Sequence, residues 1–350
     1  MSKIVRIMDI LVVVAMAIVL AGCTGSQNNA GTDTDKAIDL KEYVTAKEPE
    51  ATVPDSNSNT DKEVDVLFFM GESNMSGFGG DASAAPSVSE DAGMEFRAVT
   101  DPTTFHPIKE PFGENEARSS GLDDFPGAKE GSLVSSFINE YHDITGRRIV
   151  AVSASMGSTD MDKWTSEGIM NDIMQRYDDT MSFLDKKGLE ARHIYVVWQH
   201  GESDGLKGAA ESTYKEAVNK VMGPLFKKGL EKVFIITPGR TIDSVDVYIN
   251  VINAQINLCK EDNHYAMATT ALTAVSTECM TDQYQYNQHA LNYIGKEAAK
   301  AVAYFTEHEV EKIVYDFKHD EWIVPKGVKE DSQEKEDPIH PSDIDINREY

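Results

Sequence analysis

The sequence has few cysteines and few basic residues. It contains 3 Cys in 350 residues, and no Cys/His cluster has the spacing of a metal site. Its 33 Lys and Arg stand against 59 Asp and Glu, which gives a formal net charge of −26. So acidic a chain disfavours nucleic-acid binding and electrostatic docking on anionic lipid. We therefore expect neither a metal nor another cofactor, and no nucleic-acid partner.

Long hydrophobic runs are also scarce. The run Ile10–Leu20 is too short to span a bilayer comfortably, and Lys3 and Arg6 precede it, as in a signal peptide. It ends in Leu20–Cys23 (LAGC), which resembles the bacterial lipobox and implies cleavage before Cys23 and lipidation of its thiol. We predict a lipoprotein signal peptide at residues 1–22 and an exported protein anchored to the outer face of the cell membrane. An ordinary secretory signal with an incidental cysteine is the alternative.

Two cysteines remain beyond this signal, Cys259 on a predicted helix and Cys279 in a predicted loop. In an exported protein they could pair, but two cysteines define no disulfide framework. Two inert thiols are the favoured interpretation, and the pairing stays open.

Composition divides the rest of the chain. Residues 23–63 are rich in Thr, Asp, Asn, Ser and Ala, and cannot bury enough apolar surface to fold, so they predict a flexible tether. Residues 64–306 form the predicted globular domain. Two short β-prone runs within residues 307–326 predict a β-hairpin extension. Residues 327–350 are predicted to form an acidic tail.

Within the globular domain, apolar runs alternate with amphipathic segments. The predicted strands are Val64–Met70, Arg148–Ser155, His193–Trp198, Val233–Thr237 and Tyr265–Ala271. Single helices between strands imply right-handed crossovers and a parallel sheet. We predict an α/β fold, a three-layer α/β/α sandwich with a mainly parallel five-stranded sheet. The stretch Asp81–Gly131 has little periodicity and is predicted to be a long loop, such as a lid or pocket wall.

Four polar stretches follow the predicted strands. They are Gly71–Met75 (GESNM), Met156–Thr159 (MGST), Trp198–Asp204 (WQHGESD) and Thr281–Gln288 (TDQYQYNQ). Ligands bind outside the carboxyl ends of the strands in open α/β sheets, so these stretches are predicted to converge. Ser73 in the first stretch has the position of a nucleophile.

Together the four stretches resemble the SGNH hydrolases, and within them the sialate O-acetylesterase and acetylxylan esterase type of carbohydrate esterase. That type carries a GQSNM-like nucleophile turn, a glycine block with a later tryptophan, a WxQGESD-like block and a DxxH block before the last helix. The resemblance covers about Val64 to Phe305. It implies a flavodoxin-like SGNH hydrolase fold and a serine esterase that removes O-acetyl groups from carbohydrate.

The resemblance also implies roles for single residues. Ser73 would be the nucleophile, and the backbone N–H groups of Ser73 and Gly157 would form the oxyanion hole. Such donors stabilise charge that develops only in the transition state. Asp282 matches the aspartate of DxxH, which orients the catalytic histidine.

The third block departs from the family order, because it reads Trp198-Gln199-His200. A third oxyanion donor would align with Ser203, and the choice among Gln199, His200 and Ser203 stays open. Glu202 and Trp164 are expected to contribute to substrate binding. Glu202 with Asp204 as an acid/base pair of another chemistry is an alternative, since neighbouring carboxyls can have different pKa values. For these two residues, structural roles that brace the loop by hydrogen bonds are favoured over that pair.

The largest departure is at the histidine. Where the family has H-Y-N-Q, this chain has Gln285–Gln288 (QYNQ). A glutamine amide does not titrate near neutral pH, so Gln285 cannot take the proton of the serine. Three substitutes are conceivable: His289 four residues on, His340 in the DxxHP-spaced segment Asp337–Pro341, and His200 at a strand end.

Two functions follow. The first is a lipid-anchored serine esterase that acts on acetylated carbohydrate at the cell surface, favoured by Ser73, Gly157 and Asp282. The second is a catalytically impaired relative that binds glycan, favoured by Gln285. In both, the carbohydrate is the expected partner and the lipid at Cys23 provides the only membrane contact; the oligomeric state is left open.

Overall fold

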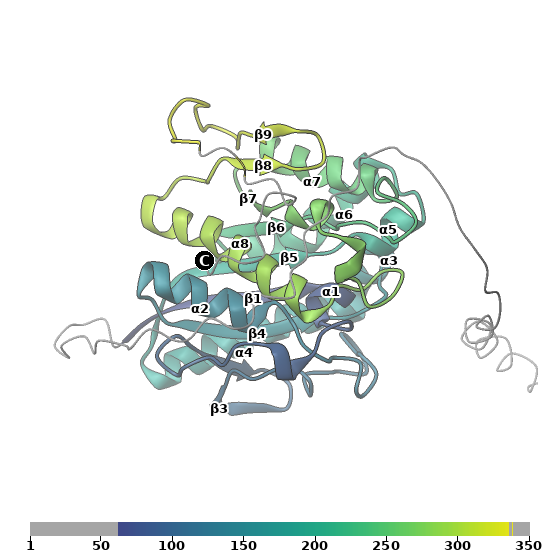
Figure 1. The fold of residues 1–350 in the computed structure, drawn as a ribbon. Helices are drawn as coiled ribbons and strands as arrows, with labels where there is room; N and C mark the ends of the chain where they lie inside the picture. The colour runs from purple at the N-terminus through teal and green to yellow at the C-terminus, as the bar shows by residue number, and fades with distance from the viewer. Residues whose placement is uncertain (1–61, 336–337, 339–350) are drawn as a thin grey trace, which may run out of the picture. The chain divides into compact units, whose positions relative to one another are not determined.

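A computed structural model describes residues 62–335 and residue 338 (Figure 1). Cys23 and His340 lie outside the described residues, as does the predicted signal peptide. None of the helices between residues 62 and 335 combines the length and apolarity needed to cross a membrane.

A seven-stranded sheet forms the centre of the molecule, in the order β3-β2-β4-β1-β5-β6-β7. The strands are β1 (Glu63–Gly71), β2 (Gly93–Arg97), β3 (Asp101–Pro107), β4 (Ile149–Ser155), β5 (Glu190–Gln199), β6 (Lys232–Ile236) and β7 (Tyr265–Thr269). All neighbours pair in parallel except β2 and β3, which are antiparallel. The predicted α/β class and the mainly parallel sheet are confirmed, and each of the five predicted strands is present.

The predicted number of strands was wrong, because β2 and β3 lie in the stretch Asp81–Gly131 that was expected to be a loop. Only three residues of β2, Gly93–Glu95, pair with β4. β3 forms the edge of the sheet and is mostly exposed or half-buried, so its sequence DPTTFHP lacks the apolar alternation by which a strand is recognised.

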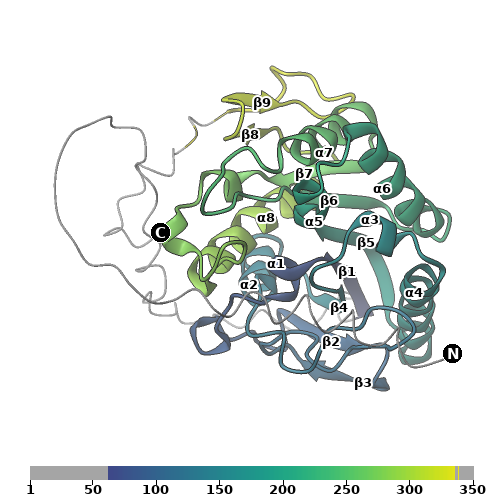
Figure 2. The same cartoon turned by 90° about the vertical axis from the view of Figure 1, so that its right-hand side faces the viewer.

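Helices cover both faces of the sheet. They are α1 (Ser73–Ser76), α2 (Val134–Thr145), α3 (Met161–Trp164), α4 (Glu167–Lys187), α5 (Glu202–Leu206), α6 (Glu211–Phe226), α7 (Ile249–Glu261) and α8 (Gln288–His308). Figure 2 shows α4, α6 and α7 on one side of the sheet and α2 and α8 on the other.

The two faces of β1 explain this layering. Successive side chains of a strand point to opposite faces. Val66, Phe68 and Met70 belong to the core beneath α4, α6 and α7. Leu67 and Phe69 belong to the core beneath α2 and α8. A strand buried on both faces reads as a continuous apolar run, as β1 does.

The predicted C-terminal hairpin is confirmed by β8 (Val314–Asp316) and β9 (Glu321–Ile323), which pair antiparallel. Cys259 lies in α7 and Cys279 in a short 3-10 helix, Thr277–Cys279. Both side chains are buried, and no disulfide joins this described pair.

Candidate active site

The nucleophile turn is built where β1 ends. Gly71 has φ +150°, and a Cβ there would lie 1.9 Å from the carbonyl oxygen of Gln199, so only glycine allows β1 to approach the end of β5 this closely. Ser73 then opens α1 and is 5% exposed. Among the described residues, no side chain or backbone group forms a hydrogen bond with the Ser73 hydroxyl. The serine therefore lies at the strand end, as predicted, and none of the described groups accepts its proton.

Asn74 connects this turn to the last polar stretch. Its Nδ2 donates to Glu202 Oε1 at 3.0 Å and to the carbonyl oxygen of Tyr284 at 3.2 Å. Its Oδ1 accepts from the backbone N–H of Tyr286 at 3.1 Å. The side chain next to Ser73 thus fixes the backbone on both sides of Gln285. We did not assign Asn74 a role from the sequence, although its place in GESNM was a signal.

Asp282 and Gln285 lie in the loop that Asn74 holds. Asp282 Oδ1 accepts from the backbone N–H of Tyr284 at 2.7 Å and of Gln285 at 2.8 Å. The Gln285 amide oxygen is buried, and no group within residues 62–335 donates to it. The structure therefore brings Gln285 to the nucleophile turn. Asp282, which is exposed, stabilises this loop through backbone groups rather than an imidazole.

The other candidate bases lie elsewhere. His200 is fully buried; its ring stacks on Trp198 with centroids 4.8 Å apart, and its Nδ1 lies 3.3 Å from the Tyr214 hydroxyl. Burial lowers the pKa of His200 to about 4, so the ring is neutral in the core. His289 is in the first turn of α8, and its Nδ1 has no partner in the described part of the chain. Neither ring forms a hydrogen bond with Ser73.

The backbone N–H of Gly157, a predicted oxyanion donor, already has a hydrogen-bond acceptor in this structure. This N–H donates to Asp124 Oδ1 at 2.7 Å. Asp124 Oδ2 accepts from the Ser76 hydroxyl at 3.1 Å and lies 3.4 Å from Lys129 Nζ. An N–H group that donates to this carboxylate is not available to a substrate oxygen. Sequence reasoning missed Asp124, because it lies in the long loop, 33 residues before Gly157.

Glu72 stands where the resembled turn has glutamine, and it holds the start of α5. Its Oε1 accepts from the backbone N–H of Gly201 at 2.8 Å and of Ser203 at 3.1 Å. The Ser203 hydroxyl donates to Oε2 at 2.5 Å. Both donors of Ser203 are therefore used by Glu72. The other two candidates for a third oxyanion donor, Gln199 and His200, are buried. The Gln199 amide donates to Glu202.

Glu202 is buried beside Glu72 rather than open to substrate. Its Oε1 accepts from Asn74 and Gln199, and its carboxyl also lies within hydrogen-bond reach of the Glu72 carboxyl. Burial, and secondarily the charge of Glu72, raise the pKa of Glu202 to about 8. Burial also raises the pKa of Glu72, so these two neighbouring carboxyls favour keeping a proton over carrying two negative charges.

This pair predicts a pH dependence of stability. The folded protein binds the Glu202 proton more tightly than the unfolded chain, whose glutamate has its ordinary pKa of about 4.3. The stabilisation is complete below that pH and is lost as the pH rises through about 8. Glu202→Gln does not lose this stabilisation. We therefore expect its free energy of unfolding, relative to that of the wild type, to increase by a few kcal/mol as the pH rises from about 5 to about 8. Urea unfolding at several pH values measures this, with exposed Glu216→Gln as the control; parallel curves for wild type and E202Q would contradict it.

Trp164, the other expected binding residue, is also buried. Its Nε1 donates to the Thr159 hydroxyl at 3.0 Å, and its ring meets the Trp198 ring edge to face at 4.8 Å. The ring therefore supports the loop after β4 from beneath, and it has no surface to offer a sugar.

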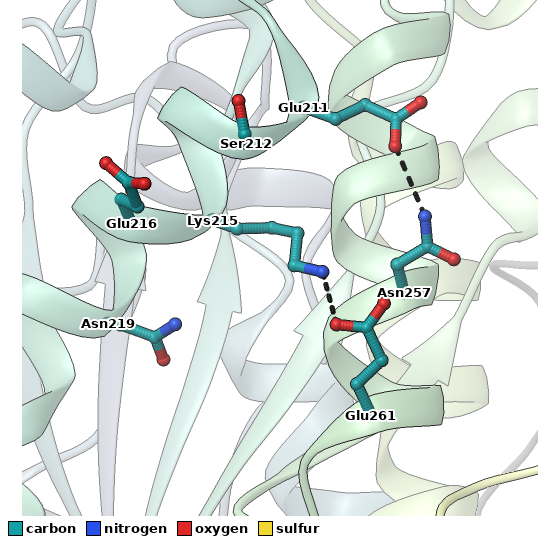
Figure 3. Close-up of a pocket in the computed structure, with 7 residues that line it drawn as sticks. All are labelled: Glu211, Ser212, Lys215, Glu216, Asn219, Asn257 and Glu261. Atoms are coloured by element: carbon teal, nitrogen blue, oxygen red, sulfur yellow. Dashed lines mark hydrogen bonds and ion pairs between the residues drawn. The ribbon is translucent and has the colours of Figure 1, made fainter.

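A surface hollow of about 550 Å³ is lined by residues of α6 and α7 (Figure 3). Its polar side chains pair with one another: Lys215 with Glu261, and Asn257 with Glu211 at 3.2 Å. None of the residues of the nucleophile turn lines it.

Comparisons with known proteins complete the description of this site. The family model described as "Carbohydrate esterase, sialic acid-specific acetylesterase" matches residues 63–304. A solved structure of NanS is 13% identical with a TM-score of 0.49, covering 70% of this chain and 98% of that one. A protein from Arabidopsis thaliana is 17% identical with a TM-score of 0.47, covering 69% and 97%. Axe2, an acetylxylan esterase from Geobacillus stearothermophilus, is 13% identical with a TM-score of 0.36, covering 69% and 93%. A comparison with curated proteins found no match.

Proposed function

This chain belongs to the family of carbohydrate esterases described as sialic acid-specific acetylesterases, and we propose that it removes O-acetyl groups from carbohydrate outside the cell through Ser73. The observation that carries this proposal is the nucleophile turn itself. Ser73 follows the central strand, and Asn74 binds the loop that carries Asp282 and Gln285.

In the proposed reaction, Ser73 Oγ attacks the carbonyl carbon of the acetyl ester. The bond to the sugar oxygen breaks, and the serine proton ends on the released sugar hydroxyl. The backbone N–H of Ser73 and, once Asp124 has moved, that of Gly157 donate to the oxyanion. Water then hydrolyses the acetyl-enzyme to acetate and free Ser73.

Both steps need a base, and no imidazole in the described part of the chain forms a hydrogen bond with Ser73. We therefore propose a slow esterase. Without a base the second step is slowed as much as the first, because the attacking water must also lose a proton. An activated ester accelerates only the first step, since its leaving group needs no protonation. The acetyl-enzyme is then expected to accumulate.

The test is mass spectrometry of the protein after incubation with an aryl acetate. We expect an acetyl group on Ser73 and a burst of released phenol, both absent from Ser73→Ala. Ser212→Ala, an exposed serine of the surface hollow, is the matched control and keeps both. Equal hydrolysis by wild type and S73A, with no acetyl adduct on either protein, would contradict the esterase proposal.

His340 is the substitute base that the same assay tests. The described tail includes Gln333, which accepts from the backbone N–H of Ile313 and donates to the carbonyl of Glu311. Glu311 pairs with Lys232 at the start of β6, whereas Ser73 follows the end of the parallel strand β1. We therefore expect His340→Ala to keep the wild-type burst; its loss would instead assign the base to the tail.

The catalytically impaired glycan binder is the second candidate. Two observations favour it: Gln285 stands in the position of the histidine, and Asp124 occupies the Gly157 N–H. Binding of an O-acetylated sugar by a protein that forms no acetyl-enzyme would support this candidate.

Location is part of the proposal. The basic residues before a short apolar run, and the lipobox-like Leu20–Cys23, support export and a lipid anchor at Cys23. The substrate would then be a carbohydrate at the outer face of the membrane.

A further inference from the structure

Asp124 is held by groups from three separate parts of the chain. The Gly157 N–H follows β4, the Ser76 hydroxyl ends α1, and Lys129 lies five residues further along the same loop. The side chains of Asp124 and Lys129 are only 8% and 7% exposed. A carboxylate nearly removed from water is stable only where donors and a cation surround it, and these groups provide both.

The groups around Asp124 are fixed independently of it. Lys129 Nζ donates to the Ser155 hydroxyl at 2.8 Å, and Ser155 lies opposite Gly71 in the pairing of β4 with β1. The Phe78 ring covers Gly157 so closely that a Cβ on this glycine would lie 2.2 Å from it. Sheet and packing thus position the ammonium group and the N–H whether or not a carboxylate lies between them.

The loop around Asp124 has fewer attachments. Asp123, the preceding residue, is exposed, and its N–H meets only the sulfur of Met156, at 3.4 Å. Phe125, the next residue, is 67% exposed, and its ring packs edge to face with that of Phe78. The carboxylate is therefore delivered from a solvent-exposed loop into a buried set of donors.

The side chain of aspartate is a carboxymethyl group, which is acetate attached to the backbone. We propose that Ser76, Lys129 and Gly157 form a binding site for a small carboxylate, that Asp124 fills this site from within the chain, and that free acetate takes its place when Asp124 is absent. The choice of acetate rests on the proposed function, whose product it is. Acetate and Asp124 would then compete for the N–H that an acyl oxygen also needs.

The experiment is chemical rescue of Asp124→Ala in the full chain. This variant leaves Lys129 buried without its carboxylate, which lowers the melting temperature. Sodium acetate is expected to restore it, whereas sodium chloride at the same ionic strength is not, and propionate does so less because it is longer. We expect acetate to bind D124A at least about tenfold more tightly than the wild type. Asp123→Ala, the exposed neighbour, is the matched control and responds like the wild type.

A second variant tests the cation. In Asp124→Ala/Lys129→Met the site has lost its charge, so the rescue by acetate disappears. If D124A does not fold, Asp124→Asn replaces it in this experiment, because it retains the shape of the side chain without the charge. Acetate should then displace the amide of this variant more readily than it displaces the native Asp124 carboxylate. Acetate that stabilises wild type, D123A and D124A equally, or none of them, would overturn the proposal. Acetate binding is measured in the absence of any ester, so it is independent of hydrolysis. If no variant hydrolysed esters, the esterase proposal would be rejected, but the carboxylate-site proposal would still be decided by acetate binding.

Discussion

Replacing Gln285 by histidine is expected to raise kcat/KM for acetyl-ester hydrolysis by about 10²–10⁴-fold, the contribution of a positioned general base. The backbone on both sides of this residue is bound by Asn74, the neighbour of Ser73. A side chain at position 285 is therefore held at the nucleophile turn. An imidazole there can take the serine proton and return it to the departing sugar oxygen.

The loop is already shaped for this change. Asp282 Oδ1 accepts the N–H groups of Tyr284 and Gln285, so the carboxylate that would orient the imidazole lies beside it. The native amide oxygen at position 285 has no donor within the described residues, so its removal breaks no hydrogen bond of the structure. Glycine at position 79 leaves space for the turn, because a Cβ there would lie 2.6 Å from that of Gln285.

Steady-state kinetics with an acetylated sugar measure the gain. Gln283→His, two residues earlier in the same loop, is the matched control and should change the rate by less than about twofold. The members of a triad act as a unit, so Ser73→Ala added to Gln285→His should remove the whole gain. The variant should also show a pH limb near the ordinary imidazole pKa of about 6.5, which the wild type lacks. A folded Q285H with the wild-type rate and pH profile would show that position 285 does not serve Ser73.

The sequence predicted those parts of the fold that have a strong periodic signal. β1 is buried on both faces and reads as an uninterrupted apolar run, so its extent and its central place were visible. β2 and β3 were not, because β2 pairs in parallel over Gly93–Glu95 alone and β3 is a largely exposed edge strand. Such strands are stabilised by tertiary pairing rather than by a pattern of their own.

The site divides in a similar way. The positions of Ser73 and Gln285 followed from the order of strands, because the carboxyl ends of parallel strands lie at one edge. Which side chains face the substrate did not follow. Glu202 and Trp164 are both buried. Hydrogen bonds from Asn74 and Gln199 to one carboxyl oxygen of Glu202 stabilise it in that position. Asp124 reaches Gly157 from an irregular loop, and contacts of that kind leave no trace in spacing or composition.

The same loop leads to the second large effect, which is on stability. Arg176 of α4 is fully buried. Its guanidinium donates to the carbonyl of Ser153 at 2.8 Å, to the carbonyl of Glu116, and to Asp172 Oδ2 at 3.1 Å. Asp172 Oδ2 also accepts from the backbone N–H of Leu122 at 2.9 Å. One arginine thus joins α4, β4 and both ends of the segment that precedes Asp124.

Arg176→Met is expected to lower the free energy of unfolding by about 3–5 kcal/mol, the cost of removing one partner from a buried ionic network. Methionine fills much of the volume but donates nothing, so the carbonyls of Ser153 and Glu116 remain buried and Asp172 loses a cation. Urea unfolding measures the loss. Gln175→Met, the exposed neighbour on α4, should stay within about 0.5 kcal/mol of the wild type. A loss below about 1 kcal/mol for R176M would mean that the network is not needed for stability. A large loss would support a loop that is fastened to the core at its base, so that only its tip at residues 123–125 has to move when the Gly157 N–H is exposed.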